Sequence, residues 1–358
     1  MAAALRGGQQ DPAAGSLRRV TTPSHHRPEG GFRNPWPDAA PADAKDMLRW
    51  TAERRRNPRV PNPPPGHFPR ATPSFATPRA APERITATWV GHSTVLLQVG
   101  GINVLTDPMW SKRASPVWFA GPKRLTPPAV DFDALPPIDV VLQSHNHYDH
   151  LDTRTVRRIA KRFPDAQWFA PLGLPPKLKK WGVRHVEERD WWQTAEYRRD
   201  GASATIGCTP AQHFSARSLR DRNETLWCGW TIEAGGRRVY FAGDTGLHPE
   251  FATIAERFGP FNLVLLPVGA YEPRWFMRRV HMNPEDALAA YRDLRGPYAD
   301  VAAPTMMAIH WGTFRLTDEP ADEPPIRIKQ RWAEAGLEEK DLWVFKHGQT
   351  RELLGPRG

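Results

Sequence analysis

The stretch Ser144-His145-Asn146-His147-Tyr148-Asp149-His150-Leu151-Asp152 carries three histidines and an aspartate within six residues. It follows a short apolar, β-branched run that is typical of a buried strand, so the cluster is expected where a strand ends. In an extended segment alternate side chains share a side, which would place His145, His147 and Asp149 together and His150 opposite. One stretch could then serve two adjacent metal ions. Neutral imidazole and carboxylate suit zinc, so the spacing predicts a metal site, with a solvated histidine-rich turn as the simpler alternative.

The composition is that of a globular chain with two unusual features, 38 prolines and 15 tryptophans among 358 residues. The two cysteines, Cys208 and Cys228, form no CxxC pair, so neither a disulfide framework nor a thiolate zinc site is expected. No apolar run approaches the ~20 residues needed to cross a bilayer, and residues 1–14 lack the apolar core of a signal peptide. We therefore expect a soluble, cytoplasmic protein.

The net charge of +10 is concentrated near the N-terminus. Residues 1–84 contain 14 Lys and Arg against 7 Asp and Glu, so they carry +7 of the total. A basic arm favours anionic surfaces, but charge alone does not separate phospholipid from nucleic acid or from a passive leader. We expect residues 1–30 to be a disordered basic leader. Residues 31–83 are expected to be a proline-rich arm with a short helix over 43–56, followed by a folded domain over 84–354.

Hydrophobic patterning predicts strands, then a helix, then strands and a helix again. The expected strands cover 85–90, 94–99, 102–105, 138–142, 168–170, 205–209, 226–233, 239–242, 263–268, 306–309 and 342–345. Helices are expected after the caps Asp152 and Asn283. This order suggests an α+β fold of two sheets face to face with helices outside. The halves around His147 and Asp244 are coarsely similar, each a hairpin followed by a strand that ends in metal-type residues.

Three more strand ends carry metal-type side chains, namely His213, Asp244 and His310. Each follows an apolar run, which would bring all of them to one rim of the sandwich. A single histidine at a strand end is more often structural. Together with the first cluster, however, they supply five histidines and two aspartates, enough for two metal ions and a bridging carboxylate.

The motif His145-x-His147-x-Asp149-His150, followed by His213, Asp244 and His310, resembles the metallo-β-lactamase superfamily. Longer strings resemble its N-acylphosphatidylethanolamine-hydrolysing phospholipase D family: WVGHST at 89–94, LTDP at 105–108, GAYEPRWFM at 269–277 and IHWGTF at 309–314. The resemblance covers roughly residues 31–350. It implies an αββα sandwich of two mixed sheets, with residues 84–354 as a metallo-β-lactamase-fold hydrolase domain.

Carried over residue by residue, the resemblance implies two zinc ions. One would be bound by His145, His147 and His213 and the other by Asp149, His150 and His310, with Asp244 bridging them. The implied reaction is hydrolysis of N-acylphosphatidylethanolamine to N-acylethanolamine and phosphatidic acid by a metal-bridging hydroxide. Two zinc ions about 4 Å apart lower the pKa of a shared water and stabilise an in-line displacement at phosphorus.

Four further residues are candidates beside the ligands. Tyr148 is expected either to contact the substrate phosphate or to pack. His281 is expected either to line the site and shuttle protons or to face solvent before a helix cap. Asp107 and His92 are expected to orient metal-bound side chains, because zinc-bound histidines usually donate their free N–H to an acceptor; His92 could equally be a buried turn residue.

A lipid substrate requires a surface that contacts the membrane. Residues 275–279 join Trp-Phe-Met to two arginines and suit contact with anionic lipid, although lid or subunit packing is an equal alternative. Residues 172–180 are a second amphiphilic candidate. The resemblance implies a homodimer with peripheral membrane contact, and no nucleic-acid partner is expected. The alternatives are hydrolysis of a lactone, a sugar-phosphate lactone or a nucleic-acid phosphodiester, or a non-enzymatic nucleic-acid or membrane adaptor.

Overall fold

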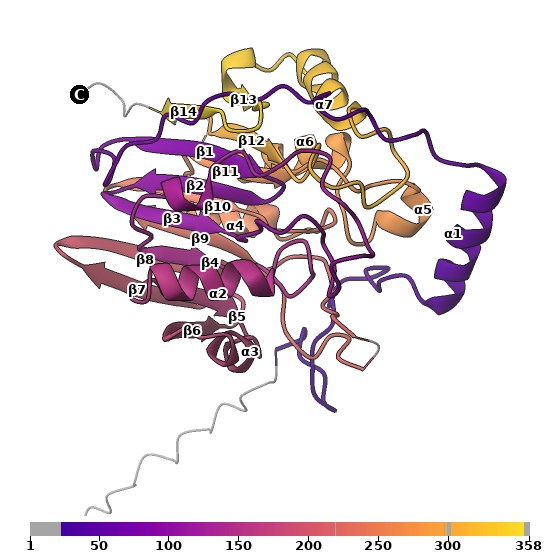
Figure 1. Ribbon diagram of the computed structural model, residues 1–358, viewed down its shortest axis with the longest axis horizontal. Coiled ribbons are helices and arrows are strands. Elements are labelled where there is room, and N and C mark those ends of the chain that lie inside the picture. The colour runs from indigo at the N-terminus through magenta and orange to yellow at the C-terminus, as the bar shows by residue number, and fades with distance from the viewer. Residues whose placement is uncertain (1–22, 219, 297, 299–301, 354–358) are drawn as a thin grey trace, which may run out of the picture.

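The computed structural model describes residues 23–218, 220–296, 298 and 302–353, and in it two seven-stranded sheets pack face to face (Figure 1). The first sheet, in the order β14-β1-β2-β3-β4-β5-β6, comprises β1 (Ile85–Gly91), β2 (Thr94–Val99), β3 (Ile102–Thr106), β4 (Val140–Leu142), β5 (Gln167–Pro171), β6 (His185–Arg189) and β14 (Thr350–Leu353). The second, in the order β13-β12-β11-β10-β9-β8-β7, comprises β7 (Thr194–Arg199), β8 (Ala202–Thr209), β9 (Gly229–Ala234), β10 (Arg237–Phe241), β11 (Leu263–Pro267), β12 (Thr305–Ile309) and β13 (Leu342–Trp343).

The helices lie outside the sheets, apart from α1 and α5 at one end of the molecule (Figure 1). They are α1 (Ala44–Arg56), α2 (Thr153–Arg162), α3 (Pro175–Lys180), α4 (Phe251–Phe258), α5 (Arg274–Met277), α6 (Pro284–Arg295) and α7 (Glu323–Glu334), with short 3-10 helices at Phe132–Ala134 and Glu339–Asp341. Asp152 caps α2 and Asn283 caps α6, as the sequence predicted. The predicted α+β sandwich with helices outside is confirmed.

The two sheets share one pattern of strand directions. In each, the first three pairings along the sheet are antiparallel and the last three are parallel, from β14 to β6 in one and from β7 to β13 in the other. Parallel neighbours end at the same edge of a sheet. The chain segments that follow β3, β4, β10 and β12 are therefore collected at the carboxyl edges of their sheets.

The core lies between the sheets and beneath the helices. In β2, Val95 and Leu97 face the second sheet and join the central cluster, whereas Leu96 faces outward and packs with Val156 and Ile159 of α2. This alternation is that of a strand buried on both faces. It leaves little freedom of register, because a shift by one residue would exchange the two faces.

The segment before the sandwich is attached to it by aromatic and ionic contacts. Trp50 of α1 packs on Phe276, with ring centroids 4.7 Å apart, and its indole N–H donates to the Asp318 carboxylate. The expected disorder of residues 1–30 falls partly outside the described residues, since 1–22 are not described. Residues 23–30 depart from that expectation. His25 is buried, stacks on Trp191 at 4.2 Å and contacts Asp190 at 2.6 Å, contacts that local sequence does not reveal.

Across the described residues, no helix is long and apolar enough to span a membrane. Both cysteines are free and buried.

Candidate metal centre

The candidate ligands come from strand ends of both sheets that face one another. β1 and β3 run in the same direction as β4, and β8 runs in the same direction as β10 and β12. The side chains that follow these strands are His92, Asp107, His145, His213, Asp244 and His310. The sandwich thereby brings residues more than 200 positions apart into one buried cluster.

The backbone bends sharply where several of these side chains are placed. His92, Asp107 and His310 have positive φ values of 58°, 33° and 62°. Such conformations cost of order 1–3 kcal/mol each for residues other than glycine and persist only where the surroundings enforce them. Gly243, just before Asp244, has φ 62°, and a Cβ there would lie 2.6 Å from the Ser144 Cβ. The strand ends thus approach too closely for a larger residue.

Three histidines form the first group of candidate ligands. His147 Nδ1 lies 3.0 Å from His145 Nε2 and 3.1 Å from His213 Nε2. Ligand atoms around a zinc with bonds of ~2.0–2.1 Å are separated by similar distances. His213 donates its other N–H to the Val280 carbonyl at 2.9 Å, which leaves the Nε2 lone pair free for a metal.

The second group contains Asp149, His150 and His310, together with His92. Asp149 Oδ2 lies 3.4 Å from His150 Nε2, 3.6 Å from His310 Nε2 and 2.8 Å from His92 Nε2. The expectation that Asp149 would share a side with His145 and His147 is wrong. Residues 148–150 form a turn, so the alternation of an extended strand no longer applies.

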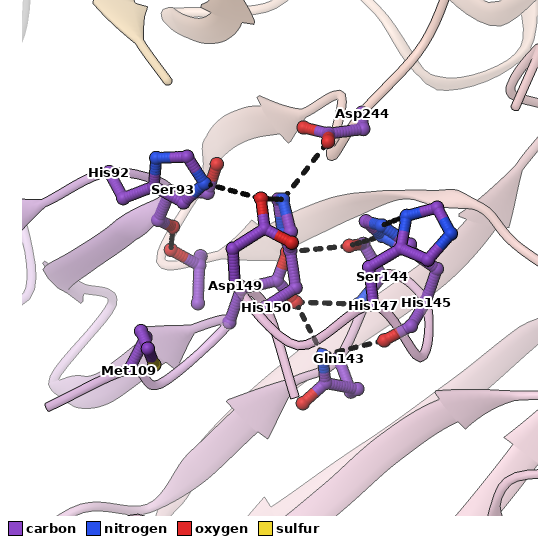
Figure 2. A network of polar contacts seen from close by, with 12 residues as sticks. His92, Ser93, Met109, Gln143, Ser144, His145, His147, Asp149, His150 and Asp244 are labelled. Carbon is purple, nitrogen blue, oxygen red and sulfur yellow. Dashed lines mark hydrogen bonds and ion pairs between the residues drawn. The ribbon is translucent and has the colours of Figure 1, made fainter. Parts of the chain in front are cut away.

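Asp244 lies between the two groups, and Figure 2 shows its contact with His150. Its Oδ2 is 3.0 Å from His150 Nε2, 3.1 Å from His310 Nε2 and 4.0 Å from His213 Nε2. Asp244 Oδ1 has no hydrogen-bond partner within the part of the chain that the structure describes. A carboxylate in this position can contact a cation in either group.

Asp107 orients one histidine of each group, His150 directly and His145 through Ser144. Its Oδ2 accepts from His150 Nδ1 at 2.6 Å and from the Ser144 hydroxyl at 2.5 Å, and its Oδ1 accepts from the Ser144 backbone N–H at 2.7 Å. The Ser144 hydroxyl in turn lies 2.8 Å from His145 Nδ1. These bonds set the tautomers of His145 and His150, leaving Nε2 of each for a metal. The link through Ser144 was missed in the sequence, where a serine beside a ligand carries no signal.

Burial keeps the first group neutral. It lowers the pKa of His147 to about 3 and that of His213 to about 4, and it lowers the pKa of His145 well below its ordinary value. Metal binding requires the unprotonated imidazole. These three side chains therefore need not lose a proton to bind a cation at neutral pH.

The second group attracts positive charge. Burial disfavours the ionised carboxylates, yet the pKa values of Asp149 and Asp244 are held well below the ordinary range, above all by attraction from His150. Burial alone would lower the pKa of His310. The neighbouring carboxylates of Asp244 and Asp149 outweigh burial and raise this pKa to about 9. The carboxylates thus draw cationic charge to this position, which is what a divalent metal would supply. The chemistry and spacing of both groups fit metal ions.

Two other predicted residues flank the cluster. His281 is 8% exposed, and its Nδ1 lies 3.9 Å from Asp244 Oδ2, so the alternative of a solvent-facing histidine is wrong. Tyr148 donates its hydroxyl to the Arg217 carbonyl at 2.9 Å, and the Arg217 guanidinium lies 3.9 Å from its ring centroid. The hydroxyl is thus engaged within the protein. Arg217 was missed in the sequence, because nothing local links it to Tyr148.

Cavities of opposite character adjoin the cluster. One, of about 260 Å³, is mainly apolar and lies between the arm residues 41–47 and the side chains of Phe214, Phe276 and Val280. Phe214 packs on the ligand His147, with ring centroids 4.5 Å apart. The other, of about 660 Å³, is cationic and includes Tyr148 of the histidine motif in its wall.

Comparison with known proteins gives a consistent result. Residues 102–311 match the model of the "Beta-lactamase superfamily domain" family. N-acyl-phosphatidylethanolamine-hydrolyzing phospholipase D 1 of Caenorhabditis elegans is 43% identical over 251 residues, 68% of either chain. An uncharacterized protein of Mycobacterium tuberculosis is 39% identical over 348 residues, 96% of this chain and 88% of that one. Among solved structures, Igni18, a metallo hydrolase from Ignicoccus hospitalis, is 25% identical with a TM-score of 0.56, covering 75% of this chain and 98% of its own.

Proposed function

Because the chain belongs to the N-acylphosphatidylethanolamine-hydrolysing phospholipase D-like family within the metallo-β-lactamase superfamily, we propose that it is a two-metal phosphodiesterase of phospholipids. The substrate would be N-acylphosphatidylethanolamine. Water would cleave the bond between phosphorus and the ethanolamine oxygen. The water oxygen would remain on phosphatidic acid, and a proton would pass to the N-acylethanolamine that leaves.

The position of Asp244 is the observation that carries the two-metal proposal. Its Oδ2 lies within 3.1 Å of His150 Nε2 and His310 Nε2 and 4.0 Å from His213 of the other group. Although both nitrogens are buried close to Asp244 Oδ2, neither His150 Nε2 nor His310 Nε2 makes a hydrogen bond among the described residues. Buried polar atoms are rarely left unpaired, so these nitrogens favour ligands for a cation.

The chain's own side chains would place the reactants. Two divalent ions, proposed to be zinc, would lower the pKa of a water and offset the phosphodiester charge when bound. Asp149 and Asp244 would bind these ions and fix their positions relative to each other. His281 Nδ1 is buried beside Asp244 and has no partner in the described part of the chain, so it is placed to carry the proton for the leaving oxygen. Tyr148 would shape the wall of the site.

The apolar cavity supports a lipid rather than a small lactone or a nucleic acid. It starts at Phe214, which packs on His147, and it is closed on the far side by the arm. An acyl chain leaving the phosphodiester could lie there, whereas a charged nucleic acid would gain nothing from such a surface. The metal-type clusters also argue against a binding-only adaptor, which has no need for them.

The test is turnover by the purified full chain on three substrate classes. We expect N-acylethanolamine and phosphatidic acid to appear in equal amounts from N-acylphosphatidylethanolamine, with no hydrolysis of lactones or oligonucleotides. Turnover of only the latter two would refute the lipid assignment. Metal analysis of the same preparation, followed by chelation and reloading with zinc, iron or manganese, identifies the metal, because such ligand sets accept several ions.

A matched pair of variants tests the carboxylates. Asp244→Asn should lower kcat by about 100-fold or more, the scale of losing one preorganised electrostatic group at a reacting centre. Asp139→Asn is the control, since Asp139 is equally buried but pairs with Arg79 at the opposite end of β4. Equal losses in both variants, with folding intact, would contradict the assignment.

A further inference from the structure

The most exposed aromatic side chains of the sandwich lie together on one loop. Trp118 is 76% exposed, Phe119 65% and Val117 37%, and the two rings contact each other edge to face. Residues 275–279, for which the sequence left membrane contact and packing as equal alternatives, are different. Phe276 and Met277 among them are buried and pack with Trp50, so the packing alternative holds for these two. In 172–180 the large apolar side chains Leu174 and Leu178 are likewise buried.

The loop that presents these side chains is held in shape by Arg113. The Arg113 guanidinium donates to the Trp118 carbonyl at 3.1 Å and to the Gly121 carbonyl at 2.6 Å, and Arg113 forms a β-bridge with Lys123. Gly121 has φ 90°, and a Cβ there would lie 2.7 Å from the Ser115 Cβ. The two rings are therefore held at the tip of a closed loop, and the loop does not bury them.

A cationic cavity of about 660 Å³ lies behind the loop. Its wall contains Val117 and Trp118 as well as six cationic side chains: Lys112, Arg113, Arg154, Arg157, Arg158 and Arg217. The single acidic side chain in the wall, Asp152, is engaged with the Ser111 backbone N–H at 3.0 Å and the Thr155 hydroxyl at 2.5 Å. Among the described residues, Arg154 and Arg157 form no ion pair. This cavity therefore carries a large excess of positive charge.

Apolar side chains at a protruding tip beside a basic cavity suit one kind of partner. A bilayer surface offers hydrocarbon to the rings and phosphate groups to the arginines at the same depth. Tyr148, within the histidine motif, belongs to the wall of the same cavity, so a membrane bound here would lie next to the metal centre. Nucleic acid matches the cations, but it leaves the aliphatic Val117 and the loop tip without an apolar partner.

We propose that Val117–Phe119 and the cationic cavity behind it form the surface by which this protein docks on anionic phospholipid membranes. This inference rests on the proposed lipid substrate and names the place where the enzyme meets it. The rings would enter the interfacial region, and Arg154 and Arg157 on α2 would contact lipid phosphates. The aliphatic parts of the arginine side chains would lie along apolar surface, and their guanidinium groups would stay among the lipid head groups.

Vesicle sedimentation with the full chain tests the proposal, using phosphatidylcholine vesicles with and without phosphatidylglycerol. The double variant Trp118→Ser with Phe119→Ser should weaken partitioning about tenfold or more, because two exposed rings no longer leave water. Arg154→Gln with Arg157→Gln should weaken binding to the anionic vesicles about fivefold per charge and reduce the effect of salt. Equal binding by either variant and the unmodified chain would overturn the proposal.

A control on the opposite helix layer separates a specific surface from general loss of hydrophobicity or charge. Ile326 of α7 is 64% exposed and Lys329 beside it is exposed, so Ile326→Ser with Lys329→Gln removes one exposed apolar side chain and one charge from that layer. This variant should bind as the unmodified chain does. If this control variant bound vesicles as weakly as the test variants, the assigned surface would be refuted. It would also be refuted if oligonucleotides bound the protein more tightly than vesicles do and displaced it from them. Binding is measured without turnover, so failure of N-acylphosphatidylethanolamine hydrolysis with intact docking refutes only the proposed function.

Discussion

Replacing Asp107 with asparagine should weaken metal binding without unfolding the protein. In the native chain Asp107 Oδ2 accepts from His150 Nδ1 and from the Ser144 hydroxyl, while Oδ1 accepts from the Ser144 backbone N–H. An amide nitrogen at the Oδ2 position can only donate, so His150 would have to accept there and carry its proton on Nε2. That is the nitrogen that faces Asp149 and Asp244.

The opposite orientation of the amide does not rescue the site. It would place the NH₂ group against the Ser144 backbone N–H, leaving a buried donor without an acceptor at a cost of about 1–3 kcal/mol. Either arrangement disturbs the ligand, and losing such an orienting partner typically lowers metal affinity or activity by about 10–100-fold. We therefore expect the metal dissociation constant of Asp107→Asn to rise by that factor.

The assay is competition for zinc against a chelator of known affinity, with kcat measured separately at saturating metal. Burial raises the pKa of Asp107 because the buried carboxylate is disfavoured as an anion, so its charge does not stabilise the metal-free fold. Metal-free Asp107→Asn should therefore remain folded, losing at most the about 1–3 kcal/mol of unfolding free energy that one unpaired buried donor costs. Unchanged zinc affinity, or a loss of affinity explained by unfolding, would refute the reasoning about the tautomer of His150.

Three other perturbations have defined outcomes. Chelation should abolish hydrolysis and lower the unfolding temperature, because clustered carboxylates lose their counter-charge; calorimetry with and without zinc measures both states. Burial lowers the pKa of His248 to about 3, below its unfolded value of ~6.5, so its stability contribution is present above pH 6.5 and is lost as pH falls toward 3. Between pH 7 and pH 5 the unfolding free energy of the unmodified protein should therefore fall by about 2 kcal/mol more than that of His248→Phe, as measured by urea unfolding. Trp50→Ala should lower the free energy that holds α1 on the sandwich by about 3 kcal/mol. Amide hydrogen exchange should then become faster in α1 and stay unchanged in β1–β5.

Several strands escaped prediction because their hydrophobic pattern is weak or absent. β6, β7 and β14 lie at the sheet edges, and β6 reads His-Val-Glu-Glu-Arg with every side chain at least partly exposed. Edge strands can be polar, since one side meets solvent and pairing supplies the backbone hydrogen bonds. The central strands were predictable, because burial on both faces selects the apolar runs that the sequence shows.

The side chains that could bind metal are recognisable in the amino-acid sequence alone. The motif from His145 to His150 and the strand ends at His213, Asp244 and His310 carry the ligand types in local order, and ligand type is a property of the side chain alone. Which of their atoms come into contact depends on how the chain folds. The fold placed Asp149 beside His150 and His310, where strand alternation had put it with His145 and His147, and it brought His281 beside Asp244.

The same division applies to the surface. Trp118 and Trp275 look alike in the sequence, each beside other large apolar groups and near arginines. Which of these clusters is exposed depends on α1, whose Trp50 covers the neighbours of Trp275 from more than 200 residues away. Periodicity records the local environment of a strand or helix, whereas burial of a loop is decided by distant segments that happen to pack on it. The docking surface therefore became visible only in the folded chain.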